Sequence, residues 1–363
     1  MKKGNEIYIS EAEWTQLNSI HSKEEIKKMI SDTIEEHNIP MPLRNISHVD
    51  AIDDFLALSS MKSNTIVKSE DWFTRYEYSY PLSNVLFKAT NIGNKSSDYY
   101  HQYNRWMCDS VNSPSPYRTW NNEKFRLTLL NALWSLKVKS VDMGTLRTCI
   151  GLRKYIASQF RPSAAKALIE YFNATSVLDF SSGWGDRLSG FMASNATHYT
   201  GVDPNSNLVD SYEKQIELFG SNKSIEMIEG CAEEVVYDRK YDLVFTSPPY
   251  FNAERYTQDS TQSFKRYKKI EDWNKGFLFP AIENAWNSLE ENGIMAINIS
   301  DVYSGHKVNN ICDPMNDFIS TLHNAEYIGC YGYEMRKRPN SGALKNKVGV
   351  FAEPIWIWKK RTK

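Results

Sequence analysis

The chain has few of the residues that mark a disulfide framework or a cysteine-based metal centre. Its five cysteines form no Cys-x-x-Cys pair and no metal-ligand spacing: Cys108, Cys149, Cys231, Cys312 and Cys330. An odd and scattered set of this kind is typical of free thiols in a reducing compartment. We therefore expect a cytoplasmic protein that holds no metal.

The chain also lacks an excess of either charge and any long apolar run. Its 43 Lys and Arg residues are balanced by 44 Asp and Glu residues, which gives a net charge of −1 and no overall cationic field for nucleic acid. No apolar run is long enough to span a membrane. Residues 1–6 contain no apolar core, so no signal peptide is expected. With 41% apolar and 24% charged residues, the composition is that of a globular chain.

The most informative segment is an apolar strand that runs directly into a proline-rich turn. The strand is expected over residues 241–246, and the turn reads Ser247-Pro248-Pro249-Tyr250. Proline fixes φ at about −65° and has no N–H, and the residue before a proline prefers an extended backbone. The result is a stiff corner that presents a hydroxyl, free backbone carbonyls and a ring face. Such a corner can hold a flat molecule with an amino group in its plane.

An earlier segment has the pattern of strand, glycine loop and helix. Residues 177–180 are apolar apart from Asp179, Gly183 and Gly185 lie in the loop, and a helix is expected over residues 184–193. This pattern opens many nucleotide-binding units. Glycine allows the backbone to approach a ligand closely and to adopt φ > 0.

Further strands follow at regular intervals, and several of them end in an acidic residue. They are expected over residues 199–203, 225–229 and 293–300, with late β-rich segments over residues 327–335 and 348–358. Asp203 follows Asp179 by 24 residues, close to the roughly 20-residue interval at which an acid reaches ribose hydroxyls. Strands alternating with amphipathic segments predict a doubly wound α/β sheet, whose ligands bind outside the carboxyl ends of the strands.

Taken in order, these motifs resemble those of the class I methyltransferases. The turn at residues 247–250 resembles the catalytic tetrapeptide of the family members that transfer a methyl group from S-adenosylmethionine to N4 of cytosine or N6 of adenine in DNA. The resemblance covers roughly residues 160–363. It implies an α/β, Rossmann-like fold with a mostly parallel seven-stranded sheet that a reversed hairpin closes. We therefore expect a catalytic domain over residues 161–363 and a mainly helical region over residues 1–160.

The resemblance also implies which residues form the site. The expected cofactor site comprises Asp179, Phe180, Ser181, Gly183, Gly185, Asp203, Cys231, Ala232 and Glu233. Within this set, Asp179 and the glycine backbone would bind the methionine part, and Asp203 both ribose hydroxyls. The catalytic corner would hold the base: Ser247, Pro248, Pro249 and Tyr250. The loop that follows it would add substrate contacts from Phe251, Arg255 and Tyr256.

Three positions depart from the family pattern. Phe180 stands where the family commonly has proline, and Ser181 stands where it has a phenylalanine that contacts the cofactor. Cys231 stands where an acid often contacts the adenine, and Glu233 is the candidate replacement. Serine at position 247 is found mostly in the enzymes that modify N4 of cytosine, so cytosine is slightly preferred over adenine as the target.

The mechanism follows from the chemistry of the acceptor. The lone pair of an exocyclic amino nitrogen is delocalised into the ring, which makes the nitrogen a poor nucleophile. Acceptors for its two hydrogens, here the Ser247 hydroxyl and the Pro248 carbonyl, favour a pyramidal nitrogen. Tyr250 would stack on the base, a contact worth about 1–3 kcal/mol. Transfer would be direct and in line, and a base in a duplex would have to be flipped out.

The N-terminal region has a different pattern. Helices are expected over residues 23–37, 125–138 and 143–160, and an irregular, aromatic-rich segment over residues 72–120. This region is a candidate cap or target-recognition part. The loop over residues 251–269 is a second candidate for substrate recognition. Four local basic clusters are candidate phosphate contacts: Lys265, Arg266, Lys268 and Lys269; Arg336, Lys337 and Arg338; Lys345 and Lys347; and Lys359, Lys360, Arg361 and Lys363.

Three hypotheses of different classes remain open. The first is a DNA amino-methyltransferase, such as the modification enzyme of a restriction-modification system. The second is a methyltransferase that acts on RNA, or on a small-molecule or protein nitrogen, and the weak basic charge favours it. The third is a cofactor-fold module without activity that binds nucleic acid or a partner. A partner nuclease and the oligomeric state cannot be read from the sequence.

Overall fold

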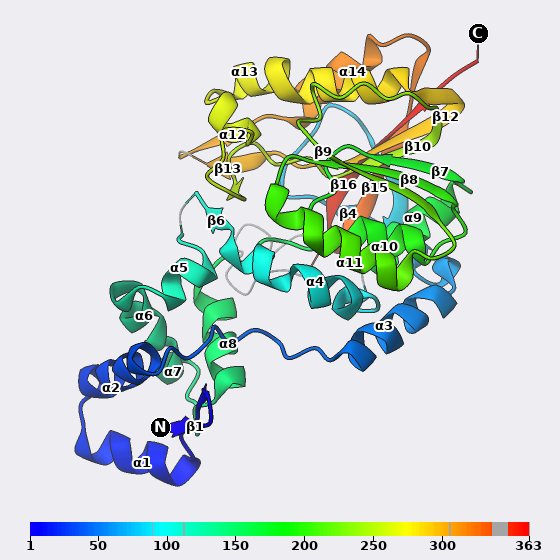
Figure 1. Ribbon diagram of the computed structural model, residues 1–363. Helices are drawn as coiled ribbons and strands as arrows, with labels where there is room; N and C mark the ends of the chain where they lie inside the picture. Colours follow the sequence, from blue (N-terminus) through cyan, green and yellow to red (C-terminus); the bar gives the residue numbers. More distant parts are fainter. Residues whose placement is uncertain (89, 112, 305, 336–347, 363) are drawn as a thin grey trace. The chain divides into compact units, whose positions relative to one another are not determined.

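The computed structural model describes residues 1–88, 90–111, 113–304, 306–335 and 348–362 (Figure 1). The chain forms two compact units. The first contains Met1–Asn45, Gln102–Ser158 and Arg255–Thr257, and the second contains Ile46–His101, Gln159–Glu254 and Gln258–Lys363. This division differs from the expected boundary at residue 160, because residues 46–101 group with the sheet of the second unit.

The second unit is built around a ten-stranded mixed sheet. Its strands are β3 (Val67–Ser69), β4 (Trp72–Phe73), β5 (Leu82–Phe87), β7 (Ser176–Asp179), β8 (His198–Asp203), β9 (Ser224–Glu229), β10 (Tyr241–Thr246), β12 (Leu289–Asn298), β15 (Ala325–Glu334) and β16 (Val350–Lys360). They lie in the order β3-β5-β15-β16-β12-β10-β7-β8-β9, and β4 pairs with β16. Two short hairpins also form, β1 (Lys2–Lys3) with β2 (Glu6–Ile7) in the first unit and β13 (Val302–Ser304) with β14 (Lys307–Asn309) in the second.

The order of the strands confirms the predicted fold class. Strands β9, β8, β7, β10 and β12 are parallel neighbours, and β16 lies antiparallel between β12 and β15. From β7 the chain adds β8 and β9 on one side and then β10 and β12 on the other side. These five parallel strands, closed by the antiparallel strands β16 and β15, form the class I methyltransferase sheet. The expected seven strands are present. The sheet has ten because β3, β4 and β5, from the N-terminal part of the chain, extend it.

Helices cover both faces of this sheet (Figure 1). One face carries α9 (Pro162–Tyr171), α10 (Asp186–Met192) and α11 (Val209–Phe219), and the other carries α13 (Ile270–Trp273) and α14 (Phe279–Asn287), with α15 (Cys312–Ser320) packed on α14 and β15. Because both faces are covered, the central strands are apolar almost throughout: Leu243, Val244 and Phe245 of β10 are fully buried. The helix α3 (His48–Ser60), the π-helical turn Asn274–Leu278 and α12 (Ser263–Arg266) also belong to this unit.

The first unit is mainly helical and has its own core. Its helices are α1 (Glu11–Ile20), α2 (Lys23–Glu36), α5 (Pro116–Trp120), α6 (Glu123–Leu130), α7 (Ala132–Ser135) and α8 (Met143–Arg153). Capping boxes at Ser10 and Ser22 fix the starts of α1 and α2. Ile26, Ile30 and Ile34 form the buried face of α2. Among the described residues, no helix combines the length and the apolar character needed to cross a membrane.

Parts of the expected N-terminal pattern were wrong. The helix expected over residues 125–138 is divided into α6 and α7 at Asn131, and the one expected over residues 143–160 ends at Arg153. The segment over residues 72–120 is not irregular, since it contains β4, β5, α4 (Asn94–Met107), β6 (Asp109–Ser110) and α5. Its tryptophans Trp72, Trp106 and Trp120 are buried, so they serve as core residues.

Candidate active site

Four polar residues end four neighbouring parallel strands. Asp179 ends β7, Asp203 ends β8, Thr246 ends β10 and Asn298 ends β12. The sheet order β8-β7-β10-β12 places these ends side by side on one edge. The Thr246 hydroxyl donates a hydrogen bond of 2.9 Å to Asp179 Oδ1. The glycine loop and the Ser-Pro-Pro-Tyr turn therefore leave the sheet from adjacent strands, at the point where the chain reverses its direction across the sheet.

Asp179 is the centre of a buried polar network. Its carboxylate accepts hydrogen bonds from Arg187 Nε at 2.7 Å and Nη2 at 3.2 Å, from Tyr199 at 2.9 Å, from Thr246 and from the Ser181 N–H at 3.3 Å. A carboxylate offers about four lone-pair sites, so these donors saturate it. The residue was expected to bind the methionine part of a cofactor. The structure shows it holding Arg187 and the start of the glycine loop, and the expected contact with a cofactor stays a prediction.

The glycine loop has the backbone that only glycine adopts without strain. Gly183 has φ of +61° and Gly185 has φ of +66°. A Cβ on Gly185 would lie 2.3 Å from Gln215 Oε1 and 2.5 Å from His101 Nε2, two atoms that are themselves hydrogen-bonded at 2.9 Å. A Cβ on Gly183 would meet nothing closer than 3.8 Å. Gly185 is therefore fixed by the protein around it, whereas Gly183 borders open space.

Asp203 has the geometry expected of a group that binds a diol. Its Oδ2 accepts from the Gly183 N–H and its Oδ1 from the Asn205 N–H, both at 2.9 Å. Each oxygen has one protein donor and therefore keeps lone-pair capacity for a ligand hydroxyl. Burial raises the pKa of Asp203 to about 6, against the opposing effect of the two backbone N–H donors. A half-buried carboxylate with spare acceptor capacity fits the ribose of a nucleoside cofactor.

The third expected motif follows β9. Cys231 and Ala232 are buried, and the Cys231 thiol donates to the Thr261 carbonyl at 3.7 Å. Arg266 pairs with Glu233 at 2.8 Å and also with Glu234. Ligand-type atoms of the cysteine and the two glutamates lie within 4.8 Å of one another, and Arg266 already forms an ion pair with each of the two carboxylates. Glu233 is therefore engaged in an ion pair, and burial raises its pKa.

The Ser-Pro-Pro-Tyr turn is tied to two residues from other strands. The Ser247 hydroxyl donates to Asn298 Oδ1 at 3.3 Å. The Tyr250 hydroxyl lies 3.4 Å from the same oxygen and 3.1 Å from Glu353 Oε2 of β16. The Asn298 Nδ2 donates to the Pro354 carbonyl at 3.0 Å. Burial, and then the Glu353 carboxylate, raise the pKa of Tyr250 well above its usual range, so the phenol keeps its hydrogen.

Several expected contact residues lie in the core or in the other unit. Phe180 is 1% exposed, so its ring cannot face a ligand, while Ser181 is partly exposed. Phe251 is also buried and packs edge-on against Trp273, although its φ of +53° marks a strained backbone directly after the turn. Arg255 and Tyr256 group with the first unit. The side chains of Phe180 and Phe251 are therefore core residues.

Sequence reasoning missed four residues of this edge: Arg187, Tyr199, Asn298 and Glu353. Asn298 was visible as a polar residue at the end of an apolar strand, and Glu353 as an acid within the apolar run that forms β16. The role of neither residue can be inferred until the order of the strands in the sheet is known. Asp301, which follows β12, caps α15 through the N–H groups of Ile311 and Cys312.

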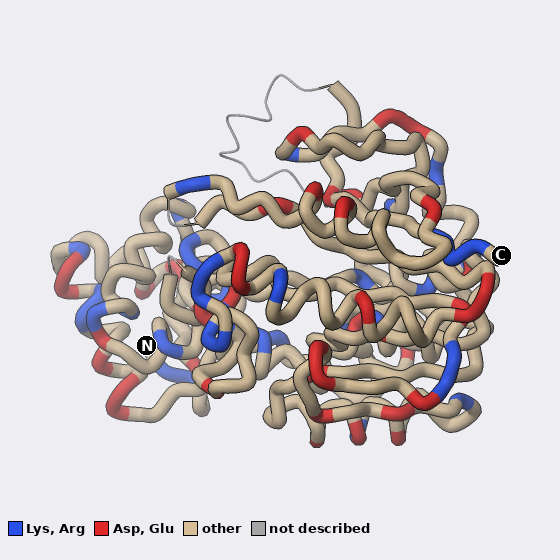
Figure 2. The backbone as a smooth tube through the Cα atoms, turned by 90° about the horizontal axis from the view of Figure 1, so that it is seen from above, with Lys and Arg blue, Asp and Glu red and all other residues tan. Residues whose placement is uncertain are grey.

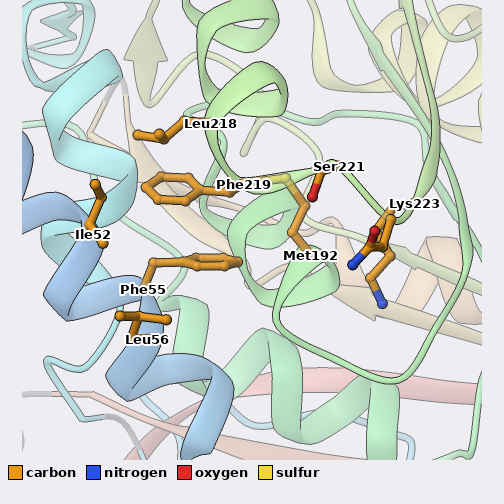
Figure 3. Close-up of a pocket in the computed structure, with 9 residues that line it drawn as sticks. Ile52, Phe55, Leu56, Met192, Leu218, Phe219, Ser221 and Lys223 are labelled. Carbon is orange, nitrogen blue, oxygen red and sulfur yellow. The ribbon is translucent and has the colours of Figure 1, made fainter.

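A separate cavity of about 350 Å³, with both apolar and polar lining residues, lies in the same unit. Figure 3 shows Phe55 of α3 and Phe219 of α11 lying face to face there, with ring centroids 4.3 Å apart. Met192 and Lys223 also line it, and they come from segments that lead into the amino ends of β8 and β9. This cavity is therefore at the edge opposite Asp179 and Asp203 and does not belong to the candidate active site.

Charges of both signs occur in both units, as Figure 2 shows. Of the expected phosphate contacts, Arg266 and Arg361 form ion pairs, and Lys360 donates to the Trp286 and Leu289 carbonyls. Lys268 and Lys269 are exposed. Lys265 donates to the Gln258 carbonyl, and Lys359 is partly exposed. The other six candidates lie outside the described residues: Arg336, Lys337, Arg338, Lys345, Lys347 and Lys363.

Comparison with known proteins gives similarities of fold only. No family model matches the chain, and no curated protein matches it in sequence. The chain is similar to the solved structure of TrmN from Thermus thermophilus, with 14% identity, a TM-score of 0.36 and coverage of 55% of this chain and 48% of TrmN. The match thus spans about half of the length of TrmN.

Two further solved structures are similar at the same level. They are an rRNA methylase from Streptococcus thermophilus (14% identity, TM-score 0.35, 57% of this chain and 100% of that chain) and the N-methyltransferase NodS from Bradyrhizobium japonicum in complex with S-adenosyl-l-homocysteine (8%, 0.36, 54% and 86%). At these scores the similarities add nothing to the fold assignment, which stands on the strand order.

Proposed function

We propose that this protein is an S-adenosylmethionine-dependent methyltransferase that modifies an exocyclic amino group of a nucleic-acid base. The supporting observation is the hydrogen bond between Asp179 and Thr246. It joins the strand that leads into the glycine loop to the strand that leads into the Ser-Pro-Pro-Tyr turn. A loop suited to a nucleoside cofactor and a corner suited to a planar amino group thus emerge at adjacent positions of one sheet edge.

The residues that bind the cofactor are those that can still accept hydrogen bonds or allow a ligand to approach closely. When bound, S-adenosylmethionine supplies an electrophilic methyl group. Asp203 accepts from the two ribose hydroxyls, and the Gly183 backbone offers close approach. Ala232 and the backbone around Cys231 border the adenine. Asp179 orients Arg187 and the glycine loop, a revision of its expected role that follows from its saturated carboxylate.

The acceptor role falls to the turn. The Ser247 hydroxyl and the Pro248 carbonyl accept the two hydrogens of an amino group, which localises the nitrogen lone pair. Tyr250 borders the base, and its hydroxyl is held by Glu353. Holding the reacting atoms in line supplies roughly 7–11 kcal/mol of the barrier reduction. Because a stacked base cannot reach such a corner, the substrate is an unpaired or flipped base, with cytosine in DNA slightly preferred.

A second acceptor class has support from the charge distribution. The chain has a net charge of −1, and Arg266, Lys360 and Arg361 are used in contacts within the protein. Binders of DNA that act without other help usually have a basic face. RNA, or a nitrogen of a small molecule or a protein, is therefore the alternative substrate.

The test is transfer of a labelled methyl group to single-stranded DNA, duplex DNA and RNA, followed by digestion to nucleosides. We expect N4-methylcytosine, or else N6-methyladenine, from single-stranded DNA. Tyr250→Ala is expected to bind cofactor but not turn over, whereas the matched control Tyr8→Ala, at an exposed tyrosine of the first unit, keeps full activity. Cofactor binding with no nucleic-acid product would move the acceptor to another class, and absence of cofactor binding would refute the proposal.

A further inference from the structure

The hydroxyl of Ser247 decides which bases the proposed site can accept. A hydroxyl has one hydrogen and two lone pairs, so it can accept from an amino group or donate to a keto oxygen. Cytosine and adenine have an amino group where uracil and hypoxanthine have a keto oxygen. A freely rotating serine hydroxyl would satisfy either kind of base. Selectivity for an amino group requires that the hydrogen of Ser247 be held elsewhere.

Asn298 is placed to hold that hydrogen. The Ser247 hydroxyl lies 3.3 Å from Asn298 Oδ1, and Asn298 is 2% exposed. The amide cannot present its nitrogen instead, because Nδ2 donates to the backbone carbonyl of Pro354 at 3.0 Å. That bond joins the end of β12 to the interior of β16 and fixes which atom of the amide faces the turn.

Glu353 accepts the Tyr250 hydroxyl hydrogen, which would otherwise compete with the Ser247 hydrogen for Asn298 Oδ1. The Tyr250 hydroxyl lies 3.1 Å from the Glu353 carboxylate and 3.4 Å from Asn298 Oδ1. A hydrogen bond to a charged acceptor is the stronger of the two, so the tyrosine hydrogen goes to Glu353. With the tyrosine hydrogen on Glu353, the acceptors beside the Ser247 hydroxyl are Asn298 Oδ1 and the Tyr250 oxygen. An amide oxygen is a stronger acceptor than a phenol oxygen, so the Ser247 hydrogen goes to Asn298.

We propose that Asn298 is a positioning residue that holds the Ser247 hydroxyl as an acceptor, and that the site therefore selects an amino-bearing base over its keto counterpart. The proposal rests on the proposed function and specifies the substrate class of the same site. With its hydrogen bonded to Asn298, the Ser247 oxygen directs only lone pairs toward a ligand. A keto oxygen at that position would face lone pairs without a donor, which costs binding affinity.

The experiment measures binding, so its result does not depend on methyl transfer. The full chain with S-adenosylhomocysteine is titrated, by fluorescence anisotropy, with homo-oligonucleotides of deoxycytidine and deoxyuridine, and of deoxyadenosine and deoxyinosine. We expect the wild-type protein to bind at least one amino strand about tenfold more tightly than its keto partner, the value of one hydrogen bond. Asn298→Ala is expected to bring this ratio close to one, as is Ser247→Ala, and the double variant to lower it no further.

Three variants separate orientation from structural support. Asn298→Asp keeps an acceptor oxygen and should keep the ratio. Ser247→Asp has no hydrogen to orient, so its ratio should not change when Asn298→Ala is added. Asn316→Ala is the matched control: Asn316 is a fully buried asparagine that accepts from Trp358 Nε1 at 2.9 Å, and its loss should lower stability but leave the ratio intact. If Asn298→Ala does not fold, Asn298→Leu, which preserves side-chain volume, replaces it.

The outcomes for this inference and for the proposed function are distinct. A wild-type ratio near one, or an Asn298→Ala ratio that equals the wild-type ratio, would overturn the role of Asn298 even if the protein methylates nucleic acid. A wild-type protein that shows the amino preference, and loses it in Asn298→Ala, but transfers no methyl group would refute the proposed activity while leaving the selectivity in place.

Discussion

The ionisation of Asp203 controls how the candidate cofactor site responds to pH. Burial raises the pKa of this carboxyl to about 6 in the free protein. Two ligand hydroxyls donate only to the ionised form, so binding lowers the pKa and releases a proton below pH 6. Affinity for S-adenosylhomocysteine, measured by titration calorimetry, should therefore be constant above about pH 7. It should fall by up to about tenfold for each pH unit below pH 6.

Two controls identify Asp203 as the source of this dependence. Asp203→Asn should bind weakly at every pH and show no slope between about pH 5 and pH 7. The pH dependence of the stability of the free protein should have the opposite sign. Because the folded-state pKa lies above the unfolded value of about 3.9, the folded state gains stability as pH falls through 6. An affinity slope that persists in Asp203→Asn would assign the titration to another group.

The Asp179–Arg187 pair should dominate the stability of the sheet edge. Both side chains are buried, with 0% and 6% exposed, and the pair distance is 2.7 Å. Removal of one partner leaves an uncompensated buried charge, which costs about 3–5 kcal/mol. Chemical denaturation of Asp179→Asn should show a loss of this size. Asp210→Asn, which breaks the exposed pair with Lys214, should cost about 0.5 kcal/mol or less. Equal losses in the two variants would contradict the buried pairing.

At the scale of residues, the sequence predicted the positions that end strands and failed for contacts that cross the sheet. Asp203 and Ser247 follow apolar runs, so their place at the carboxyl edge could be read directly. Asn298 meets Tyr250 because β12 lies beside β10, and Glu353 meets it because β16 lies beside β12. Neither side-chain contact is encoded in a local pattern. Saturation of Asp179 was equally invisible, since its donors come from three different elements.

At the scale of elements, the glycine loop shows how position decides the effect of one methyl group. Gly185 combines a left-handed backbone with a Cβ position 2.3 Å from Gln215 Oε1. Gly185→Ala should cost about 2–4 kcal/mol in thermal or chemical unfolding and weaken cofactor binding. Gly151 of α8 has nothing within 4 Å of its Cβ position, so Gly151→Ala should stabilise the protein by about 0.5–1 kcal/mol. Stability changes of the same sign in the two variants would contradict this explanation of the two glycines.

Strands were easier to predict than the elements of the first unit. The expected strand over residues 225–229 became β9 at Ser224–Glu229, because the partly buried Ile225 and Met227 alternate with exposed residues at the period of a strand. The strands β3 and β4 have three and two residues, too few to show periodicity. Both depend on partners far along the chain, since β3 pairs with β5, which pairs with β15, and β4 pairs with β16.

At the scale of the whole molecule, the sheet unit depends on residues from both halves of the chain. The pairing of β5 with β15 covers an edge that would otherwise expose backbone donors and acceptors. Leu86 and Phe87 of β5 are fully buried. Residues of α4 contact the elements beside the glycine loop: Ser97 donates to Asp186, the first residue of α10, at 2.5 Å, and His101 pairs with Gln215, which donates to the Gly185 carbonyl. The division of the chain into two units therefore does not follow its order in sequence.

A fragment that begins at residue 161 tests this dependence. It retains the seven strands of the expected catalytic domain but loses β5 and the contacts from α4 to the glycine loop. Because the β15 edge becomes open and the loop loses two buried hydrogen bonds, we expect the fragment to self-associate in size-exclusion chromatography. It should also show no thermal shift with S-adenosylhomocysteine, whereas the intact chain gains about 2.7 kcal/mol at 100 times its dissociation constant. A monomeric fragment with the melting temperature and cofactor shift of the intact chain would show that residues 46–101 are an addition to the catalytic sheet rather than a part of it.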